Sequence, residues 1–383
     1  MFLHKQAAPE ESSGAAFWCP RSDLNGDARL GTGPQPAAYA NSATGANCTV
    51  IISPGAFLVN PRQIPYNEEI ARFVPPLQPR HRRGVYYWQG SSPPSKVAVH
   101  WITVTIRIIS DSSCNVPDSY QQSLGIIQVP AWVNFADGAS LRNGIDISDA
   151  EFYRRLQNEK RLPTTSQPTP QDFIDIIHTF DPEDQVILAC VSSKMSGTYN
   201  SAVQARDALP QADIFLYDTL SVSMGGAWQI IAGAEAAVRG ADVETVLQAM
   251  ESSRSRVHIY FTIDTLKYLA ASGRAPTLQA IMGNLLDIKP MMNVQDGTLA
   301  LVGKVRGRKK SKRELMELVA VEVGDKPLRL AVVNANAPDE AAEMAEAAKE
   351  RLNVQEMLVV DLGPVLGALT GPGTLAFGAF VQE

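Results

Sequence analysis

Two short segments of this 383-residue chain concentrate side-chain hydroxyls, and together they could hold an anion. Thr164 and Thr165 stand in the first segment, and Ser196, Gly197 and Thr198 stand in the second. Each segment follows an expected strand or leads into an expected helix, so free backbone N–H groups lie beside the hydroxyls. The glycine lets the backbone approach a ligand closely. This combination is typical of a site for a carboxylate or a phosphate.

Neither segment matches a standard catalytic or nucleotide-binding pattern. The second lacks the G-x-x-x-x-G-K of a phosphate-binding loop and the G-x-S-x-G of a nucleophile elbow. A plain structural role, as helix caps and turns, is the alternative for both segments. Another alternative is an α/β hydrolase or transferase that uses Ser196 as its nucleophile. No histidine motif that would position a base supports that reading, and no metal-ligand pattern is present.

Three further loops carry polar residues that could support such a site. Asp111 and Ser112 follow the first expected strand, and Asp218 and Ser223 flank a later strand-to-helix loop. Ligands of open α/β sheets bind at the carboxyl ends of strands, which favours these positions. Helix capping is the simpler role for each of them. Arg274 follows an expected helix end, and its guanidinium suits a carboxylate.

Charge and composition narrow the class of protein. The net charge of −6 argues against a protein built to neutralise nucleic acid. The segment 304–313 holds seven basic residues in ten, without interleaved aromatic residues, and indicates a solvated helix start or a docking surface for an acidic partner. The sequence has no run of about 18 apolar residues and no apolar signal core, so we expect no membrane span. Four cysteines without a paired spacing favour the cytoplasm.

From residue 104 onward, expected strands and helices alternate, which predicts an α/β fold. We expect two lobes, at 104–255 and 256–383, each a sheet with flanking helices. Helix starts are marked by a capping box at Ser148 and by Thr169 followed by Pro170. Near-continuous apolar runs predict six strands, at Ile106–Ile109, Val186–Val191, Ile214–Tyr217, Val257–Thr262, Leu328–Val333 and Met357–Asp361.

Residues 1–103 differ from the rest of the chain. They hold 12 of the 25 prolines and show no sustained helical or strand period. Such a segment buries too little apolar surface to offset its chain entropy, so we expect it to be mostly disordered. Because no methionine stands between Met1 and Met195, we also expect translation to start near Val104 from a non-methionine codon. A genuine disordered extension is the alternative.

Taken in order, the polar segments match a known pattern. It comprises Ile108–Ser113, Thr164–Pro168, Ser192–Tyr199, Asp218-Thr219 with Ser223 and Gly225, Gly273-Arg274, Lys289-Pro290, and Gly363–Gly367 with Gly371-Pro372-Gly373. Through these motifs, residues 104–383 resemble the DegV family. The first 103 residues have no counterpart in it.

The resemblance implies a fatty-acid carrier. In that family a long-chain fatty acid lies between two lobes, and the protein is the lipid-binding subunit of a two-component fatty acid kinase. The separate ATP-dependent kinase phosphorylates the carboxylate, so the carrier itself needs no cofactor and is not an enzyme. Carried over by motif, the carboxylate would meet Thr164 or Thr165, together with Ser196, with Arg274 nearby. The basic segment 304–313 would face the kinase.

One position departs from the family pattern. The family usually has a histidine before its final Thr-Gly-Pro-Gly, and this chain has Leu369. A leucine can neither donate a hydrogen bond nor carry a proton. The resemblance therefore supports lipid binding more strongly than it supports transfer to the kinase.

Overall fold

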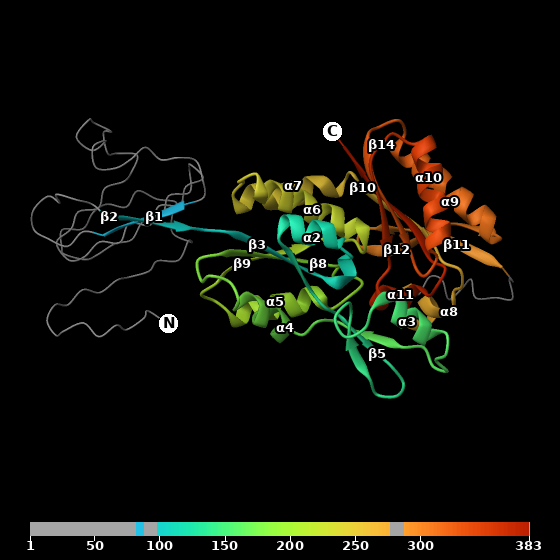
Figure 1. Ribbon diagram of the computed structural model, residues 1–383, viewed down its shortest axis with the longest axis horizontal. Helices are drawn as coiled ribbons and strands as arrows, with labels where there is room; N and C mark the ends of the chain where they lie inside the picture. The colour runs from blue at the N-terminus through green and yellow to red at the C-terminus, as the bar shows by residue number, and fades with distance from the viewer. Residues whose placement is uncertain (1–81, 88–97, 276–286, 383) are drawn as a thin grey trace, which may run out of the picture. The chain divides into compact units, whose positions relative to one another are not determined.

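The computed structural model describes residues 82–87, 98–275 and 287–382, and it contains two compact units that divide at residue 105 (Figure 1). In the first unit, β1 (Arg82–Tyr87) pairs antiparallel with β2 (Ala98–Thr103). The other residues of the N-terminal 103 lie outside the described part of the chain. Their expected disorder, and the expected start near Val104, stay predictions.

The second unit opens with a four-stranded parallel sheet in the order β4-β3-β8-β9. Every residue of β8 is buried, as its continuous apolar run predicts for a strand covered on both faces. The strands are β3 (Ile106–Asp111), β4 (Ile126–Val129), β8 (Gln185–Cys190) and β9 (Asp213–Asp218).

Helices cover both faces of this sheet. Helices α4 (Pro170–Ile177) and α5 (Thr198–Ala208) pack on one face. On the other face lie α2 (Asp118–Leu124) and α6 (Met224–Val238), with α7 (Val243–Arg254) against α6 (Figure 1). The predicted cap at Thr169 is confirmed at the start of α4, where Thr169 and Asp172 exchange hydrogen bonds and Pro170 is the first helical residue. At Ser148, where a capping box was predicted, the hydroxyl accepts from the Glu151 N–H at 3.3 Å.

A small antiparallel sheet, in the order β6-β5-β7, contains the first hydroxyl-rich segment. This segment was not among the predicted strands, yet Thr164–Ser166 forms strand β7. Threonine is β-branched and suits a strand, but three residues are too few to show a two-residue period. The other elements here are β5 (Trp132–Asn134), β6 (Ser140–Arg142), α3 (Asp149–Leu156) and the 3-10 turn η2 (Ser112–Cys114).

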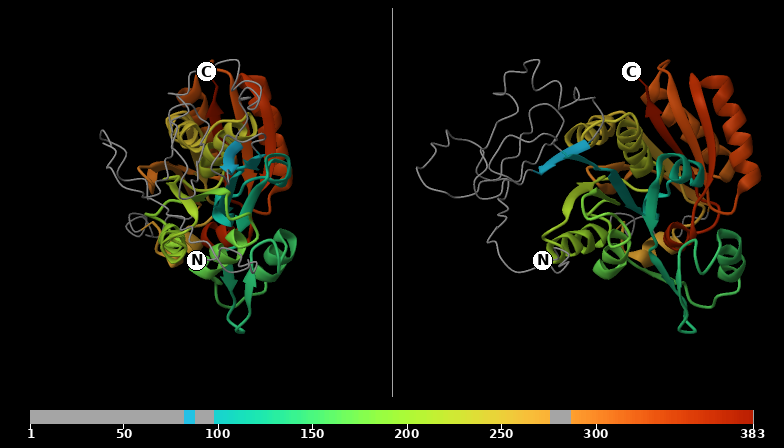
Figure 2. Two further views of the ribbon diagram at one scale, coloured as in Figure 1. Left: turned by 90° about the vertical axis from the view of Figure 1, so that its left-hand side faces the viewer. Right: turned by 60° about the vertical axis from the view of Figure 1, so that its left-hand side comes forward.

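The second lobe is a six-stranded sheet in the order β12-β11-β10-β15-β13-β14, in which only β13 and β14 pair in parallel. Helices α9 (Arg308–Val323) and α10 (Pro338–Arg351) pack over one face, and Figures 1 and 2 show them side by side. Its strands are β10 (Val257–Thr262), β11 (Ile288–Gln295), β12 (Thr298–Arg306), β13 (Leu328–Asn334), β14 (Val354–Asp361) and β15 (Leu375–Val381). Two short helices, α8 (Lys267–Ser272) and α11 (Pro364–Thr370), complete this lobe.

The predicted α/β fold with two lobes is confirmed, and each of the six predicted strands lies within or overlaps an observed one. The sequence reading missed the hairpin of β11 and β12, although Asp296-Gly297 is a hairpin-turn signal and both residues have positive φ. A buried apolar cluster takes residues from both large sheets, and the indole N–H of Trp228 on α6 donates to the Gly378 carbonyl on β15. The division into domains 104–255 and 256–383 stays a proposal. No helix in the described ranges is long and apolar enough to cross a membrane.

Candidate functional site

A cavity of about 710 Å³ lies where loops of the parallel sheet, strand β7 and the six-stranded sheet meet. Its volume falls in the range of roughly 300–1,000 Å³ that is typical of small-molecule sites. Both hydroxyl-rich segments reach it, through residues 165–167 and 193–198. Most of the remaining wall is apolar and includes Val222, Ile259, Phe261, Leu299, Val333 and Leu366.

The second hydroxyl-rich segment brings its predicted residues together. Ser196, Gly197 and Thr198 all line the cavity, and α5 begins at Thr198. The hydroxyl oxygens of Ser196 and Thr198 are 2.8 Å apart, and the Thr198 N–H donates to Ser196 Oγ at 3.3 Å. The start of α5 adds backbone N–H groups and the positive end of a helix dipole. This end of the cavity is therefore suited to an anion.

The first hydroxyl-rich segment contributes Thr165 but not Thr164. Thr165 is half-buried in β7 and lines the cavity, whereas the exposed Thr164 does not. Of the two candidates that the sequence left open, the structure brings Thr165 to the cavity.

A side chain at Gly197 would require Gln167 to move. A Cβ atom placed there would lie 2.1 Å from Oε1 of Gln167. Gln167 also lines the cavity, and its amide donates to the Ser201 hydroxyl at 3.0 Å. Sequence reasoning did not single out Gln167 as a site residue; its place directly after Thr164-Thr165-Ser166 was the available signal.

Arg274 lines the cavity and is exposed. Its Nη1 donates to the Ser272 carbonyl at 2.6 Å, which keeps the side chain close to the end of α8. Together with Lys194, it provides positive charge at the cavity wall. No His, Asp, Glu, Tyr or Cys lines the cavity among the residues that the structure describes.

Asp111 and Ser112 hold loops and do not line the cavity. The buried Asp111 carboxylate accepts from the N–H of Ser113 at 2.9 Å and from that of Val191 at 2.7 Å. Burial raises the pKa of Asp111, while these hydrogen bonds oppose the rise. Ser112 Oγ accepts from the N–H of Ala131 at 3.0 Å. The two residues tie the end of β3 to segments that do reach the cavity.

Asp218 supports a loop of the site without lining the cavity, whereas Ser223 lines the cavity. Asp218 accepts from the N–H groups of Ser193 and Leu220, at 3.2 and 3.0 Å, and so braces the loop that carries Ser196. Ser223 lines the cavity, but it makes none of the helix-cap hydrogen bonds expected of it. Its φ is +50°, and its buried hydroxyl has no hydrogen-bond partner in the described part of the chain.

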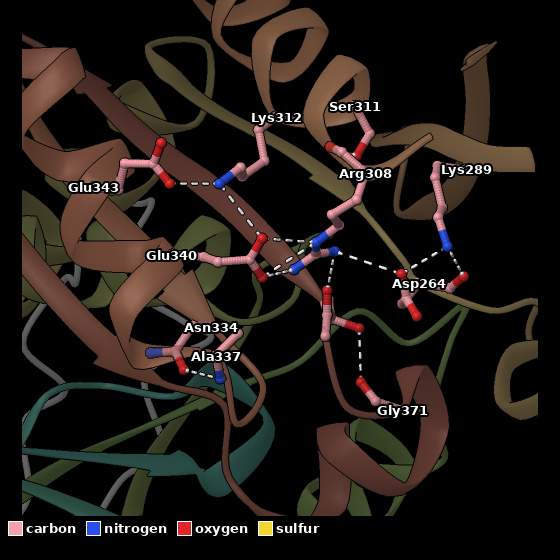
Figure 3. Close-up of polar contacts among 12 residues, drawn as sticks. Asp264, Lys289, Arg308, Ser311, Lys312, Asn334, Ala337, Glu340, Glu343 and Gly371 are labelled. Atoms are coloured by element: carbon pink, nitrogen blue, oxygen red, sulfur yellow. Dashed lines mark hydrogen bonds and ion pairs between the residues drawn. The ribbon is translucent and has the colours of Figure 1, made fainter. Parts of the chain in front are cut away.

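The predicted basic segment divides into paired and exposed cations. Arg308 and Lys312 form ion pairs with Glu340, and Lys312 also contacts Glu343 (Figure 3). The exposed members are Lys304, Arg306, Lys309, Lys310 and Arg313. The free positive surface is therefore smaller than the sequence suggests.

Leu369 lies in α11 and lines the cavity, half-buried. Its apolar side chain stands at the position where the resemblance implies a histidine. Neither His178, which is exposed at the end of α4, nor His258, which contacts Glu322, lines the cavity. The described ranges contain no group of acidic, histidine and cysteine side chains that could bind a metal.

Comparisons with known proteins find relatives that are named or described as DegV proteins or as fatty acid-binding proteins. A protein of Caldanaerobacter subterraneus subsp. tengcongensis named as DegV domain-containing is 31% identical over 285 residues, which are 73% of this chain and 99% of that protein. A Thermotoga maritima protein named as a fatty acid-binding protein is 30% identical, over 73% of this chain and 98% of that protein. The structure of a DegV family protein from Thermus thermophilus, described as binding fatty acid, matches with a TM-score of 0.68 at 31% identity, over 73% of this chain and 100% of that one.

The similarity extends over the whole second unit. The family model for DegV, described as a family of uncharacterised proteins, matches residues 105–382. The N-terminal boundary of this match agrees with the boundary between the two compact units. The chain belongs to the DegV family.

Proposed function

We propose that the chain binds one long-chain fatty acid in this cavity and presents its carboxylate to a separate ATP-dependent kinase. The single observation that carries the proposal is the cavity itself, which joins a cluster of hydroxyls to a mostly apolar wall. Fatty acid binding by the Thermotoga maritima and Thermus thermophilus relatives supports the same ligand class.

The head group would be held by Thr165, Ser196 and Thr198. A buried carboxylate without partners is costly, and hydroxyl donors with the N–H groups at the start of α5 reduce that cost. Hydrogen bonds to a charged acceptor contribute about 1.5–3 kcal/mol each. Arg274 and Lys194 add positive charge, and no carboxylate in the described wall competes for it.

The acyl tail would lie along the apolar wall. Each methylene group that leaves water contributes about 0.8 kcal/mol, so a long chain gains much more than a short one. Side chains from both lobes, including Val222 and Phe261, would contact the tail. The same wall excludes water from the acid.

The chemistry would belong to the partner, because the described cavity wall has no general base beside Ser196. A serine hydrolase needs such a base, so we favour a carrier that lets the kinase supply ATP and phosphorylate the carboxylate. The exposed cations Lys309 and Lys310, at the start of α9, are the surface that we propose the kinase contacts. We also propose a cytoplasmic location.

Native mass spectrometry of the purified chain, followed by lipid extraction, tests the proposal. We expect one long-chain acid per chain. Ser196→Ala should weaken its retention, while Ser252→Ala, an exposed serine on α7, should not. An empty protein that hydrolyses esters, or equal retention in both variants, would contradict the assigned site.

The kinase step needs a second measurement. With a kinase subunit and ATP, we expect acyl phosphate to form only when both proteins are present. Replacing Lys309 and Lys310 with glutamate should slow this transfer and leave lipid retention unchanged. Unchanged transfer in that variant would place the kinase contact elsewhere.

A further inference from the structure

A glycine-rich turn at residues 371–374 separates the cavity from a charged cluster on the surface of the lobe. The cluster consists of Asp264, Lys289, Arg308 and Glu340. Thr370 and Thr374 line the cavity on either side of Gly371 and Gly373. Both glycines have positive φ, +81° and +80°. A Cβ atom at Gly371 would lie 2.2 Å from the Tyr268 ring, so this part of the wall has no room for a side chain.

The turn is held on its inner side by hydrogen bonds. The N–H of Gly373 donates to the Ala335 carbonyl at 2.7 Å, and the N–H of Ala335 donates to the Thr374 carbonyl at 2.9 Å. The hydroxyl of Thr374 donates to the Gly371 carbonyl at 2.9 Å. These bonds attach the turn to the end of β13 but leave the Gly373 carbonyl to accept from elsewhere.

Arg308, the first residue of α9, donates to that carbonyl. Its Nη1 lies 2.5 Å from the Gly373 oxygen. Its Nε and Nη2 bind the Glu340 carboxylate at 3.1 and 2.6 Å, so one planar guanidinium spans the turn and the start of α10 (Figure 3). The Arg308 guanidinium beside Glu340 holds the pKa of that carboxyl below its ordinary value.

The same cluster reaches a second segment of the cavity wall. Asp264, whose carboxylate lies 4.0 Å from Arg308, accepts from Lys289 through its carboxylate at 2.7 Å and its carbonyl at 2.8 Å. Asp264 precedes α8, which carries the cavity residue Leu269. The charged cluster therefore lies behind two cavity-lining segments that are about a hundred residues apart in sequence.

We infer that Arg308 is a positioning residue for the lipid cavity: its hydrogen bond to the Gly373 carbonyl sets the wall formed by residues 370–374. As far as it concerns lipid, this inference rests on the proposed function. Without that hydrogen bond the turn keeps its inner bonds but loses its outer support. The cavity then releases its lipid faster, although Arg308 does not touch the cavity.

The geometry requires arginine. A guanidinium presents its donors in a fixed fork, whereas a lysine ammonium is a point charge on a flexible stem. In Arg308→Lys, the ammonium can pair with Glu340 but cannot hold Glu340 and the Gly373 carbonyl at the present spacing. In Glu340→Gln, the ion pair is lost while the bond from Arg308 to Gly373 can remain. The two variants therefore separate positioning of the turn from general stability.

The experiment measures both variants by hydrogen exchange of a peptide that spans residues 369–376, by the dissociation rate of bound fatty acid, and by urea unfolding. Arg239→Lys, the same exchange at an exposed arginine that ends α6, is the matched control. For Arg308→Lys we expect the hydrogen-exchange rate of this peptide and the lipid dissociation rate to rise about tenfold each, because one charge-assisted hydrogen bond is lost. For Glu340→Gln we expect lower stability and a dissociation rate close to that of the unaltered chain.

Unchanged exchange in Arg308→Lys would overturn the inference. A Glu340→Gln variant that releases lipid as fast as Arg308→Lys would also overturn it, because the ion pair would then be the cause. If the unaltered chain carries no fatty acid, the proposed function fails, and hydrogen exchange at the turn still decides the role of Arg308.

Discussion

The Ser192 hydroxyl donates a 2.6 Å hydrogen bond to the carbonyl oxygen of Gly297, 105 residues further along the chain. Ser192 begins the loop that carries Ser196, and Gly297 lies at the tip of the β11–β12 hairpin. A Cβ atom at Gly297 would lie 2.7 Å from Ser192 Oγ, and its φ is +77°. The loop that carries Ser196 in one lobe is therefore fixed against the hairpin of the other, and residues of both, including Ser196 and Leu299, line the cavity.

The two adjacent threonines of β7 should have different effects on lipid binding. Thr165→Val removes a hydroxyl from the cavity wall and keeps the shape of the side chain. We expect about tenfold weaker binding, because a hydrogen bond to a carboxylate contributes at least about 1.5 kcal/mol. Thr164→Val, at the exposed neighbour, should change affinity less than twofold. Displacement of a fluorescent fatty acid measures both, and equal losses would contradict the assignment of Thr165.

Ser223→Gly should stabilise the protein. Ser223 has a φ of +50° and a buried hydroxyl that lacks a partner among the described residues. A strained backbone of this kind costs about 1–3 kcal/mol, part of which glycine gives back through its larger unfolded-state entropy. We expect the free energy of unfolding in urea to rise by about 1 kcal/mol. Ser223→Ala keeps the Cβ atom, so it should raise the free energy of unfolding by less. A lower free energy of unfolding in both variants would mean that the Ser223 hydroxyl has a hydrogen-bond partner in the native protein.

Asp111→Asn replaces only one oxygen atom of the carboxylate, yet it should lower the free energy of unfolding strongly. Both carboxylate oxygens accept backbone N–H groups, from Ser113 and Val191. An asparagine amide puts an N–H against one of these donors and leaves it unpaired, which costs about 1–3 kcal/mol. Urea unfolding measures the loss. Asp207→Asn, at an exposed residue of α5, is the control, and an equal effect there would rule out this cause.

Leu369→His should make lipid binding depend on pH. A histidine at this position of the wall can carry a positive charge beside a bound carboxylate. Desolvation lowers the pKa of an imidazole and a bound anion raises it, so the transition should lie around its ordinary value of about 6.5. We expect tighter binding at pH 5.5 than at pH 8, measured against Leu369→Asn, which is polar but does not titrate. Parallel pH profiles for the two variants would contradict a contact with the head group.

The ion pair of Glu340 predicts a second pH dependence, this time of stability. The pKa of Glu340 is lowered, first by its hydrogen bonds with Arg308. Its stabilising contribution is therefore complete above the ordinary glutamate pKa of about 4.5 and is lost as pH falls through the lower folded value. The difference in unfolding free energy between the unaltered chain and Glu340→Gln should shrink from pH 7 to pH 3. Glu350→Gln, exposed on α10, should show no such trend.

Local signals in the sequence were enough to predict much of the fold. The apolar run Val257–Thr262 coincides with β10, and Thr169 with Pro170 marks the start of α4. Strand β7 was missed because three residues carry no period. The β11–β12 hairpin was missed because polar residues and a proline interrupt both strands, at Lys289 and Pro290 in β11 and at Lys304 in β12. Strand β12 is also a partly exposed edge strand, so its pattern differs from that of a buried strand.

By itself, the sequence determined the residue types at the site: hydroxyls in two short segments, an arginine after an expected helix end, and a leucine at position 369. Only the tertiary structure decided that Thr165 and not Thr164 reaches the cavity, that Asp111 holds a loop, and that Arg308 supports the Gly371–Thr374 turn. Helix caps and strand periods depend on neighbours in sequence. The cavity wall depends on which loops the two sheets bring together in space. A local sequence pattern carries no information about contacts between residues that are far apart in the chain.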